Sequence, residues 1–509
     1  MKNLVRMQQL KLMMQGSIVG ILAGIVAIIY RLLLSYAQQF VDMMANLIKQ
    51  QWFYLLIWLL LGMIVVIIVG RILEKEAMSA GSGIPQLEGE MQGAIDQNWK
   101  SVLSAKMIGG TLCSMMGLSL GREGPSIQLG AMVGKAIAQT TTAFKQEEKF
   151  LLTCGAAAGL SAAFNAPLAG VLFALEEIHK NFSVSVLVSV ICASVCGDFV
   201  SKIVFGFDPS FHFTISQAIP LSQYYLLILL GIICAISAII YNKTTLLTQD
   251  LYQKITWIKP CYRVIIPILI GSIFICFVPS VLGGGHGMVE MLYEPSNLSL
   301  KIIVGLFVLK FLYSMISFGS GAIGGIFFPL LVLGSFIGAI FAKAMGIDAI
   351  YFNNYVVFAM AAFFAGIVRA PITGIVLISE MCGSLQFFLP ITLVSIIAYV
   401  ICNVLDCEPI YESLLHRILK KQNKVVEEVE DKHIIREFVV QLNSQACNRE
   451  IKDIAWPNDI LITSVTRGQK KLMPSGSLKL MTGDLLRIKI EKNKQQQLAK
   501  LIEKITTYE

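Results

Sequence analysis

The sequence predicts an all-α polytopic membrane protein with a small soluble α+β domain at its C-terminal end. Only 15% of its 509 residues are charged and 55% are hydrophobic, whereas soluble globular proteins average roughly a quarter charged residues. The mean hydropathy is +0.70. Apolar segments recur from residue 16 to about 402, and the chain becomes charged after about residue 420. Most of the chain therefore belongs in lipid and its last part in water.

The first apolar segment, Gly16 to Leu34, follows a basic, Met-rich stretch. It is long enough to span a membrane, and many similar segments follow it. We therefore interpret it as a first membrane helix and not as a secretory signal. The further predicted spans are 52–72, 101–118, 149–164, 184–205, 222–241, 263–281, 300–318, 355–368 and 386–402.

Shorter apolar stretches between these spans are broken by Gly and Pro. The backbone must satisfy its own hydrogen bonds in lipid, so an interrupted helix is tolerated there only beside protein or a wet cavity. Interrupted segments in matching halves of a chain are a pointer to a transporter's binding site. The breaks therefore predict where an ion or substrate binds.

The two halves of the membrane part match at a fixed spacing of 204 residues, without a gap. The matched pairs are Gly121–Gly325, Pro125–Pro329, Leu129–Leu333, Gly130–Gly334, Gly134–Gly338, Ala157–Ala361, Ala166–Ala370, Pro167–Pro371, Gly170–Gly374 and Glu176–Glu380. Chance pairs of Gly and Ala are common in membrane proteins, but one register across both proline-centred motifs is not. We infer an internal duplication with halves at about 16–205 and 222–402, and leave open whether the repeats are inverted or parallel.

The last part of the chain reads as a charged linker, 421–430, and a soluble α+β module, 431–509. Short strands are predicted at 438–440 and 460–462, a turn and strand at 483–488, and a polar helix at 495–504. With about 80 residues, the module is near the lower size for a domain that folds unaided.

Three loops share one design, in which a Gly-rich backbone is followed by Pro at the start of an apolar helix. They are 81–85 (GSGIP), 121–125 (GREGP) and 325–329 (GIFFP). Proline suits the first helical turn, where N–H groups lack intrahelical partners. These N–H groups and the positive end of the helix dipole bind anions. We therefore predict an anion site, with helix kinks or packing turns as the alternative.

Glu123 lies inside the second of these loops. Its carboxylate would be attracted by the same N–H groups as an anion and repelled by the anion itself, so the two compete for one position. Protonation removes that competition and couples proton binding to anion binding. The alternative is a glutamate that only caps a helix, but ionisable groups within membrane segments are functional by default.

Glu176 and Glu177 end the apolar stretch from Leu168 to Leu175. We expect them at the cytoplasmic end of a helix, either as a proton entry station or as an ordinary solvated helix terminus.

Other classes of function find little support in the sequence. The net charge of +8 comes from Lys and Arg at loop edges, which is typical of cytoplasmic anchoring and not of nucleic-acid binding. The eleven cysteines show no metal spacing. None of the Gly-rich loops ends in the Gly-Lys-Ser/Thr that binds phosphates. We expect no enzymatic activity, no cofactor and no metal.

The motifs GSGIPQLEG (81–89), GREGPSIQLG (121–130), GAAAGLSAAFNAPLAGVLF (155–173) and GGIFFP (324–329) resemble those of the CLC chloride channels and chloride/proton antiporters. RAPITG (369–374) and EPIYESLL (408–415) fit as well. The resemblance covers roughly residues 15–420. It implies about eighteen short and tilted helices in two inverted halves, and a homodimer in which each subunit holds its own ion pathway.

The resemblance also implies roles for individual residues. The chloride site would use the Ser82 hydroxyl, the N–H groups of Ile326 and Phe327, and the Tyr411 hydroxyl. Glu123 resembles the gating glutamate, and Glu177 resembles the inner proton glutamate of the antiporter branch, which channels usually lack. Serine at position 82 is similar to chloride-preferring members, since nitrate-preferring members have proline there. The fluoride-exporting members depart from the family at the GREGP loop and at the tyrosine. Because this chain keeps GREGP (121–125) and Tyr411, we do not expect it to export fluoride.

The tail departs from the eukaryotic CLC pattern, because it shows no pair of CBS domains. Residues 431–490 instead resemble the C-terminal lobe of RCK/TrkA regulators of potassium transport, through 464–468 (SVTRG), 474–476 (PSG) and 482–484 (TGD). Such lobes are thought to dimerise and to bind small ligands, and the sequence does not identify a ligand. The alternative is a solvated cap that only aids assembly.

The leading hypothesis is electrogenic exchange of chloride for protons across a bacterial-type plasma membrane, with the C-terminal domain in the cytoplasm. A passive chloride channel gated by voltage or pH is the second hypothesis. The third, a potassium transporter regulated by the tail, would need a carbonyl filter like Thr-Val-Gly-Tyr-Gly, and the sequence contains none.

Overall fold

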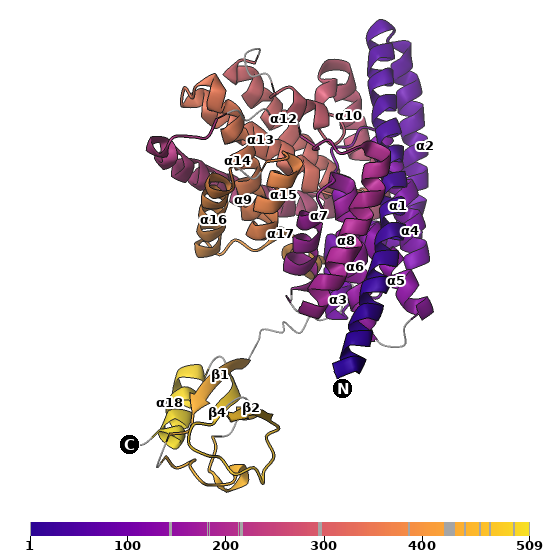
Figure 1. Ribbon diagram of the computed structural model, residues 1–509. Coiled ribbons are helices and arrows are strands. Elements are labelled where there is room, and N and C mark those ends of the chain that lie inside the picture. The colour runs from indigo at the N-terminus through magenta and orange to yellow at the C-terminus, as the bar shows by residue number, and fades with distance from the viewer. Residues whose placement is uncertain are drawn as a thin grey trace. The chain divides into compact units, whose positions relative to one another are not determined.

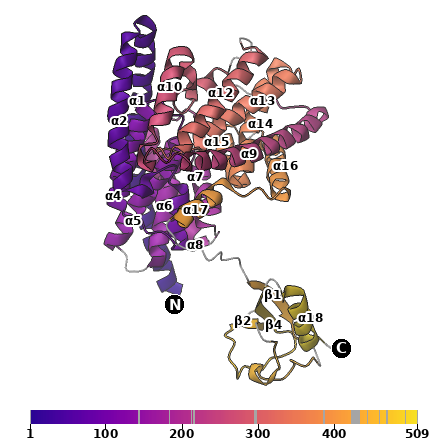
Figure 2. The ribbon, with the colours of Figure 1, turned by 180° about the vertical axis from the view of Figure 1, so that it is seen from behind.

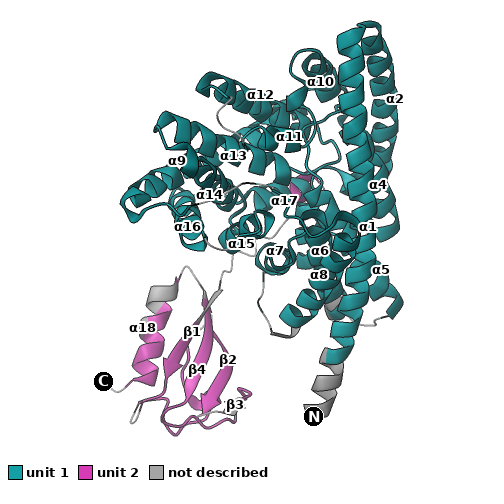
Figure 3. Ribbon diagram, turned by 45° about the horizontal axis from the view of Figure 1, so that its top comes forward, with its two compact units in different colours: residues 1–418 teal, residues 419–509 magenta. Residues whose placement is uncertain are grey.

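The computed structural model divides the chain into two compact units, residues 1–418 and 419–509 (Figure 3). The described residues are 2–141, 145–180, 182, 184–211, 213, 217–293, 298–384, 387–421, 433–441, 444–457, 460–467, 470–491 and 494–507. The predicted linker 421–430 lies outside them except for Lys421, which ends a helix.

The first unit is built from helices of very different length (Figure 1). Its helices are α1 (Lys2–Gln50), α2 (Phe53–Lys75), α3 (Ile84–Gln92), α4 (Trp99–Met115), α5 (Glu123–Thr141), α6 (Lys145–Phe164), α7 (Pro167–Phe173), the π-helix η2 (Ala174–His179), α8 (Val184–Phe205), α9 (Tyr224–Gln253), α10 (Ile265–Phe277), α11 (His286–Glu290), α12 (Leu300–Gly319), α13 (Phe327–Ala344), α14 (Ala349–Val368), α15 (Pro371–Met381), α16 (Phe388–Val404) and α17 (Ile410–Lys421).

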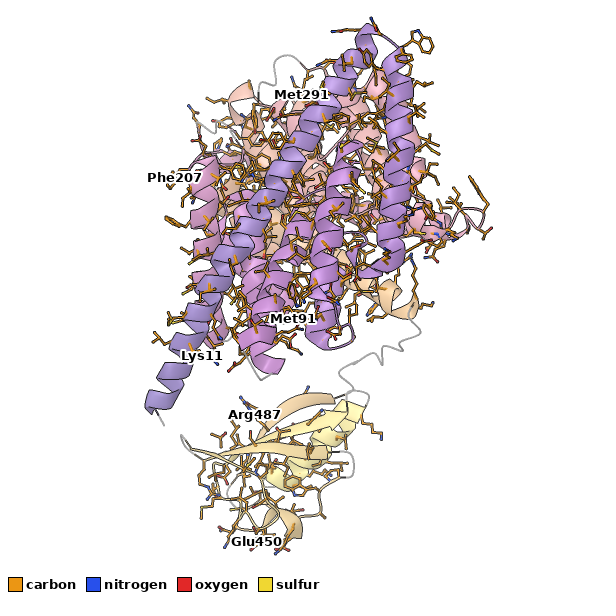
Figure 4. The ribbon with its side chains drawn as sticks, turned by 90° about the vertical axis from the view of Figure 1, so that its right-hand side faces the viewer. Lys11, Met91, Phe207, Met291, Glu450 and Arg487 are labelled. Atoms are coloured by element: carbon orange, nitrogen blue, oxygen red, sulfur yellow. The ribbon has the colours of Figure 1, made fainter. Side chains whose placement is uncertain are left out.

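Eight helices within the described residues are long and apolar enough to cross a membrane. The predicted all-α membrane fold is therefore confirmed. Large apolar side chains are exposed along α1, α2, α8 and α9, and Figures 2 and 4 show α1 and α2 as long neighbouring helices at one side of the unit. An apolar exposed face of this kind fits lipid as its surroundings. The first helix is much longer than the predicted span 16–35, because α1 continues in both directions.

Very short helices interrupt this arrangement. α3 has 9 residues, α7 has 7 and α11 has 5. α3 and α11 each begin after a glycine in the left-handed region, Gly83 with φ 92° and Gly285 with φ 103°. A side chain with a Cβ atom rarely adopts this conformation, so glycine is what allows the chain to turn sharply into each short helix.

Glycine also sets the distance between α5 and α6. A Cβ atom on Gly130 would lie 2.1 Å from the carbonyl oxygen of Gly155, and one on Gly155 would lie 2.0 Å from that of Gly130. Small residues allow helix backbones to approach closely in membranes, where no hydrophobic force drives helices together. In the second half, Gly334 and Gly338 bring α13 close to the backbone of α14 in the same way.

We expect Gly130→Ala to destabilise the first unit by about 1–3 kcal/mol, the usual effect of overpacking. The added methyl group would collide with backbone, which cannot move aside as a flexible side chain can. Thermal unfolding in detergent would measure the loss. Gly305→Ala in α12 is the matched control, because no atom lies within 4 Å of its Cβ position and alanine is the better helix former. An unchanged melting temperature for Gly130→Ala would contradict this account.

The two halves are related by a local two-fold arrangement. Gly121 and Gly325, the residues paired by the 204-residue spacing, form an antiparallel bridge with N–H···O distances of 2.6 and 2.8 Å. In such a bridge each residue donates to the other, so the two segments run in opposite directions. Figure 4 shows Met91, near the end of α3, and Met291, the residue after α11, at opposite ends of the unit. The repeats are therefore inverted.

A second pair of contacts repeats this relation at helix starts. The Glu176 carboxylate accepts hydrogen bonds from the N–H groups of Ile372 and Thr373, at 3.3 and 2.8 Å. The Glu380 carboxylate accepts them from Leu168 and Ala169, at 3.1 and 2.8 Å. Each half thus supplies the acid that caps a helix start in the other half, α15 in one case and α7 in the other.

The second unit is a small α+β domain. Its strands are β1 (His433–Val439), β2 (Ile460–Arg467), β3 (Lys470–Leu472) and β4 (Leu485–Glu491), and its helix is α18 (Gln495–Thr506). The strands form an antiparallel sheet in the order β1-β4-β2-β3. Alternate residues of β4 (Leu486, Ile488, Ile490) are buried in one core with Leu498 and Ile502 of α18, so the helix covers one face of the sheet. The predicted strands and the final helix are confirmed.

An ion pair between Arg467 and Asp484 joins two of the tail motifs described above, SVTRG (464–468) and TGD (482–484). Arg467 donates from Nε and from one terminal nitrogen to the two Asp484 oxygens, both at 2.8 Å, and the Met481 N–H donates to Asp484 at 2.9 Å. Burial opposes ionisation of Asp484, but the hydrogen bonds from Arg467 and Met481 outweigh it and lower the pKa of the Asp484 carboxyl below its usual range.

We expect Asp484→Asn to destabilise the second unit by about 2 kcal/mol at neutral pH, since it removes charge-assisted hydrogen bonds. A lowered pKa in the folded state stabilises the fold above the usual aspartate pKa, and this contribution is lost as the pH falls through the folded value. The difference between wild type and variant should therefore shrink below about pH 4. Hydrogen exchange at β4 in the full chain measures it, and a difference that does not depend on pH would contradict the ion pair.

Candidate functional site

The three Gly-rich loops meet in the first unit through backbone hydrogen bonds. The Gly81 N–H donates to Ala322 O and the Gly324 N–H donates to Gly81 O, both at 3.1 Å. Gly121 pairs with Gly325 as described above. The loop that begins at Gly325 is therefore bonded to both of the others, and the starts of α3, α5 and α13 lie together.

Ser82 and Tyr411 contribute two hydroxyl groups to this region. Both residues are buried, and within the described residues neither hydroxyl has a hydrogen-bond partner. Ser82 touches the second loop, because a Cβ atom on Gly124 would lie 2.3 Å from Ser82 Oγ. Tyr411 lies in the first turn of α17, where its hydroxyl is within electrostatic reach of Glu177, Glu88 and Glu123. Buried hydroxyls normally find a partner, so these two leave room for one.

Ile326 and Phe327 form the start of α13, with Ile326 as the residue before the first helical turn. N–H groups at this position have no intrahelical acceptor. Both side chains are buried, and the Phe327 ring packs against Phe164, Phe173 and Phe364, with centroid distances of 5.5, 5.7 and 4.9 Å. These contacts fix the helix start in the interior of the unit.

Glu123 is the first residue of α5 and is completely buried. The N–H groups of Phe328, Arg122 and Glu123 itself approach its carboxylate, but neither oxygen has a full hydrogen bond within the described residues. Arg122 is the nearest cation, with Nε 3.5 Å from Glu123 Oε1. The carboxylate thus lies among helix-end amides and forms an ion pair with Arg122.

A cavity of about 540 Å³ reaches Glu123 from one end of the unit. Its walls come from α1, from the loop before α11 and from the starts of α5 and α13; they include Tyr30, Gln38, Arg122, His286 and Phe328. The His286 ring stacks on the Phe328 ring, with centroids 3.8 Å apart. Glu123 therefore lines this cavity at the start of α5.

Glu177 lies in the π-helix η2 and is 5% exposed. Single π-turns are rare and recur at functional sites. Its neighbour Glu176 is different, because both of its oxygens are used to cap α15. Of the two acids predicted as an entry station or a solvated terminus, Glu176 is a structural cap of α15 and Glu177 is buried.

Sequence analysis missed two buried lysines. Lys106 Nζ donates to Ser79 O and Gly81 O, at 3.0 and 2.8 Å. Lys310 Nζ donates to Val281 O and Gly283 O, at 3.0 and 2.7 Å. Lys106 thus fixes the loop of Ser82. The signal was present, since Lys106 and Lys310 are also 204 residues apart.

Residues 61–403 match the family described as voltage gated chloride channel. The chain belongs to this family, the CLC proteins. Residues 435–503 match the TrkA-C domain, which confirms the resemblance seen in the tail.

Curated relatives support the assignment. The chain is 36% identical over 358 residues to the H(+)/Cl(-) exchange transporter ClcA of Vibrio cholerae serotype O1, which covers 68% of this chain and 75% of the relative. It is 33% identical over 420 residues to the ClcA of Vibrio vulnificus strain YJ016, which covers 80% of this chain and 89% of the relative.

Solved structures share the CLC fold. The crystal structure of a slow cyanobacterial Cl−/H+ antiporter matches with a TM-score of 0.76 and 28% identity, over 81% of this chain and 99% of that chain. A CLC-type fluoride/proton antiporter matches with a TM-score of 0.64 and 20% identity, over 79% of this chain and 96% of that chain, a likeness that concerns the fold alone.

Proposed function

We propose that this CLC protein exchanges chloride for protons across the membrane. The relatives named above are H(+)/Cl(-) exchange transporters, and the structural neighbour with the higher identity is a Cl−/H+ antiporter. The observation that carries the proposal is a buried carboxyl, Glu123, at a helix start, together with the buried hydroxyls of Ser82 and Tyr411, which have no hydrogen-bond partner within the described residues. A second buried acid, Glu177, favours exchange over a passive channel.

In this proposal chloride binds between the Ser82 and Tyr411 hydroxyls and the N–H groups of Ile326 and Phe327. These groups carry partial charges, so they bind the ion without holding it too tightly for release. The nearby full charge, Lys106, is occupied by two backbone carbonyls. Lys106 would therefore raise the local potential and orient the Ser82 loop without touching the ion.

Glu123 couples the two ions by competition. As a carboxylate, it occupies the amides at the starts of α5 and α13 and excludes chloride from that position. When it takes up a proton it loses its charge, so chloride can replace it. The proton then leaves through the cavity at one side or passes towards Glu177 at the other. Two carboxyls on opposite sides of the anion site would let protons cross without following the path of chloride.

Proton movement driven by chloride tests this function. Sealed vesicles containing the purified protein should move protons uphill when they are given a chloride gradient, with a membrane potential clamped by potassium and valinomycin. Chloride flux without any proton movement would favour the channel instead and defeat the proposal. Empty vesicles supply the background.

We further propose a homodimer in a plasma membrane with the second unit in the cytoplasm. Lysines at the end of α17 and basic residues near Lys11 in α1 fit the positive-inside rule when these two helix ends face the cytoplasm. Light scattering of the detergent-solubilised protein should give the mass of two chains; the mass of one chain would contradict the dimer. The location of the second unit can be tested with Ser477→Cys, at an exposed position. The new thiol should react with an impermeant reagent only from the cytoplasmic side.

The TrkA-C domain would regulate transport or assembly and not ion choice. It forms a separate compact unit, while the anion site lies wholly in the first. We expect deletion of 425–509 to leave the chloride/nitrate preference unchanged while it alters transport rate or dimer stability. Flux ratios in vesicles measure the preference, and a changed ratio would contradict this division of roles.

A further inference from the structure

A ring of four buried polar side chains joins α3 to α5. Gln128 of α5 donates from Nε2 to Gln97 Oε1, at 2.6 Å, and Gln97 donates from Nε2 to Oε2 of Glu90 in α3, at 2.8 Å. The other Glu90 oxygen forms an ion pair with Lys135, which belongs to α5 again. Gln128 and Lys135 lie two turns apart on one face of α5. The ring therefore starts and ends on the same helix and encloses the end of α3.

The members of this ring are closed to water. The exposed fractions are 2% for Gln97, 0% for Gln128 and 1% for Lys135, and the Glu90 side chain is 8% exposed. Lys135 Nζ also donates to Gln97 O and to Asp96 Oδ1, both at 2.6 Å. A buried polar group that loses its partner is costly, and networks of such groups act together. Opening the ring at one member should therefore loosen the whole of it.

Gln128 also holds the loop that carries Ser82. The second hydrogen of its amide goes to Met78 O, at 3.0 Å, and a Cβ atom on Gly83 would lie 2.2 Å from Gln128 Oε1. The side chain thus contacts the chain both before and after Ser82. One turn earlier on α5, Gly124 lies against Ser82 Oγ. Residues four apart on a helix are neighbours, so Gly124 and Gln128 form one surface on which the Ser82 loop rests.

We propose that this ring positions Ser82 relative to Glu123 and thereby sets the anion selectivity, with Gln128 as the positioning residue. The proposal deepens the proposed exchange and rests on its anion site. Glu123 begins α5 and the Ser82 loop leads into α3, so a clamp between these two helices holds the hydroxyl and the carboxyl in one rigid body. A site of fixed dimensions separates chloride from the larger, planar nitrate better than a site that can adapt to either.

The ratio of chloride flux to nitrate flux in vesicles tests this role in the full-length protein. Gln128→Met keeps the length of the side chain and removes both hydrogen bonds that its amide donates, so the ratio should fall by several-fold. The ratio does not depend on how much of the protein is folded. A purely structural role would lower the two fluxes together, and an unchanged ratio in Gln128→Met would overturn the proposal.

Gln97→Met provides a second test if Gln128→Met gives no transport. It opens the ring at its middle and leaves the bond from Gln128 to Met78 O in place. The ratio should fall in the same direction, because the clamp between α3 and α5 is lost. A wild-type ratio in Gln97→Met would show that the ring does not position the site, and the proposal would fail.

Gln139→Met is the matched control on α5. Gln139 is exposed and accepts a hydrogen bond from the Trp99 indole, at 3.1 Å, so it lies on the same helix and outside the ring. The same amide is replaced by the same side chain, and the chloride to nitrate ratio should stay at the wild-type value. A fall as large as in Gln128→Met would assign the effect to any loss of an amide on α5 and overturn the role of the ring.

This proposal and the proposed exchange can fail separately. Proton movement driven by chloride decides the exchange, whereas the ratio of two anion fluxes decides the role of the ring. If the wild-type protein moves no protons, the exchange fails, yet the ratios of the wild type and Gln128→Met still report on the clamp. If the wild type exchanges and Gln128→Met keeps the wild-type ratio, the exchange stands and the positioning role falls.

Discussion

Replacing Glu123 by alanine should abolish proton coupling while chloride still crosses the membrane. The variant removes the group that we propose competes with chloride at the amides of α5 and α13 and takes up the proton there. Proton uptake driven by a chloride gradient should fall to the level of empty vesicles. Chloride efflux should continue and lose its dependence on pH, because the carboxyl proposed to produce that dependence is gone.

The wall of the same cavity offers a control for this prediction. Glu290 also lines it but is exposed at the end of α11, so Glu290→Ala should retain coupling. Glu123→Gln, which resembles the protonated acid, should behave as the alanine variant does. Continued uphill proton movement in Glu123→Ala would show that Glu123 is not the coupling residue.

Glu177→Gln is expected to have a similarly large effect from the other side of the anion site. Glutamine has the shape of the acid but cannot release a proton, so proton flux should fall to background while chloride moves passively. The same vesicle assay measures both fluxes. Glu147→Gln is a suitable control, because this acid forms only a partly exposed ion pair with Lys11, at 3.3 Å. Normal proton flux in Glu177→Gln would exclude Glu177 as the inner station.

Much of this molecule was predictable from its sequence, because the internal duplication repeats the same motifs at a fixed spacing. The 204-residue spacing located both Pro-centred helix starts, and the three Gly-rich loops that share one pattern do meet in space. Gly81, Gly121 and Gly325 were visible because each begins a Gly-rich loop that leads to a proline at the start of an apolar helix. The strands and the final helix of the tail followed from local sequence patterns.

What the sequence did not predict depends on contacts between distant residues. Glu88 reads as an ordinary acid in a short helix, yet the structure leaves only 1% of it exposed. Glu176 and Glu177 are adjacent in sequence, yet the π-helix directs one to the start of α15 and the other to the interior. The 204-residue spacing alone could not show that the repeats are inverted, since an offset in sequence carries no direction in space; the family resemblance implied the inversion.

The crossed capping by Glu176 and Glu380 has a bearing on the ancestry of the fold. Neither half contains the acid that its own helix start requires, so neither is complete alone. A protein made of one half could satisfy α7 only by borrowing Glu176 from a copy inserted the opposite way up. Such an ancestor would have had to enter the membrane in both orientations, and joining two copies into a single chain would have fixed one of each.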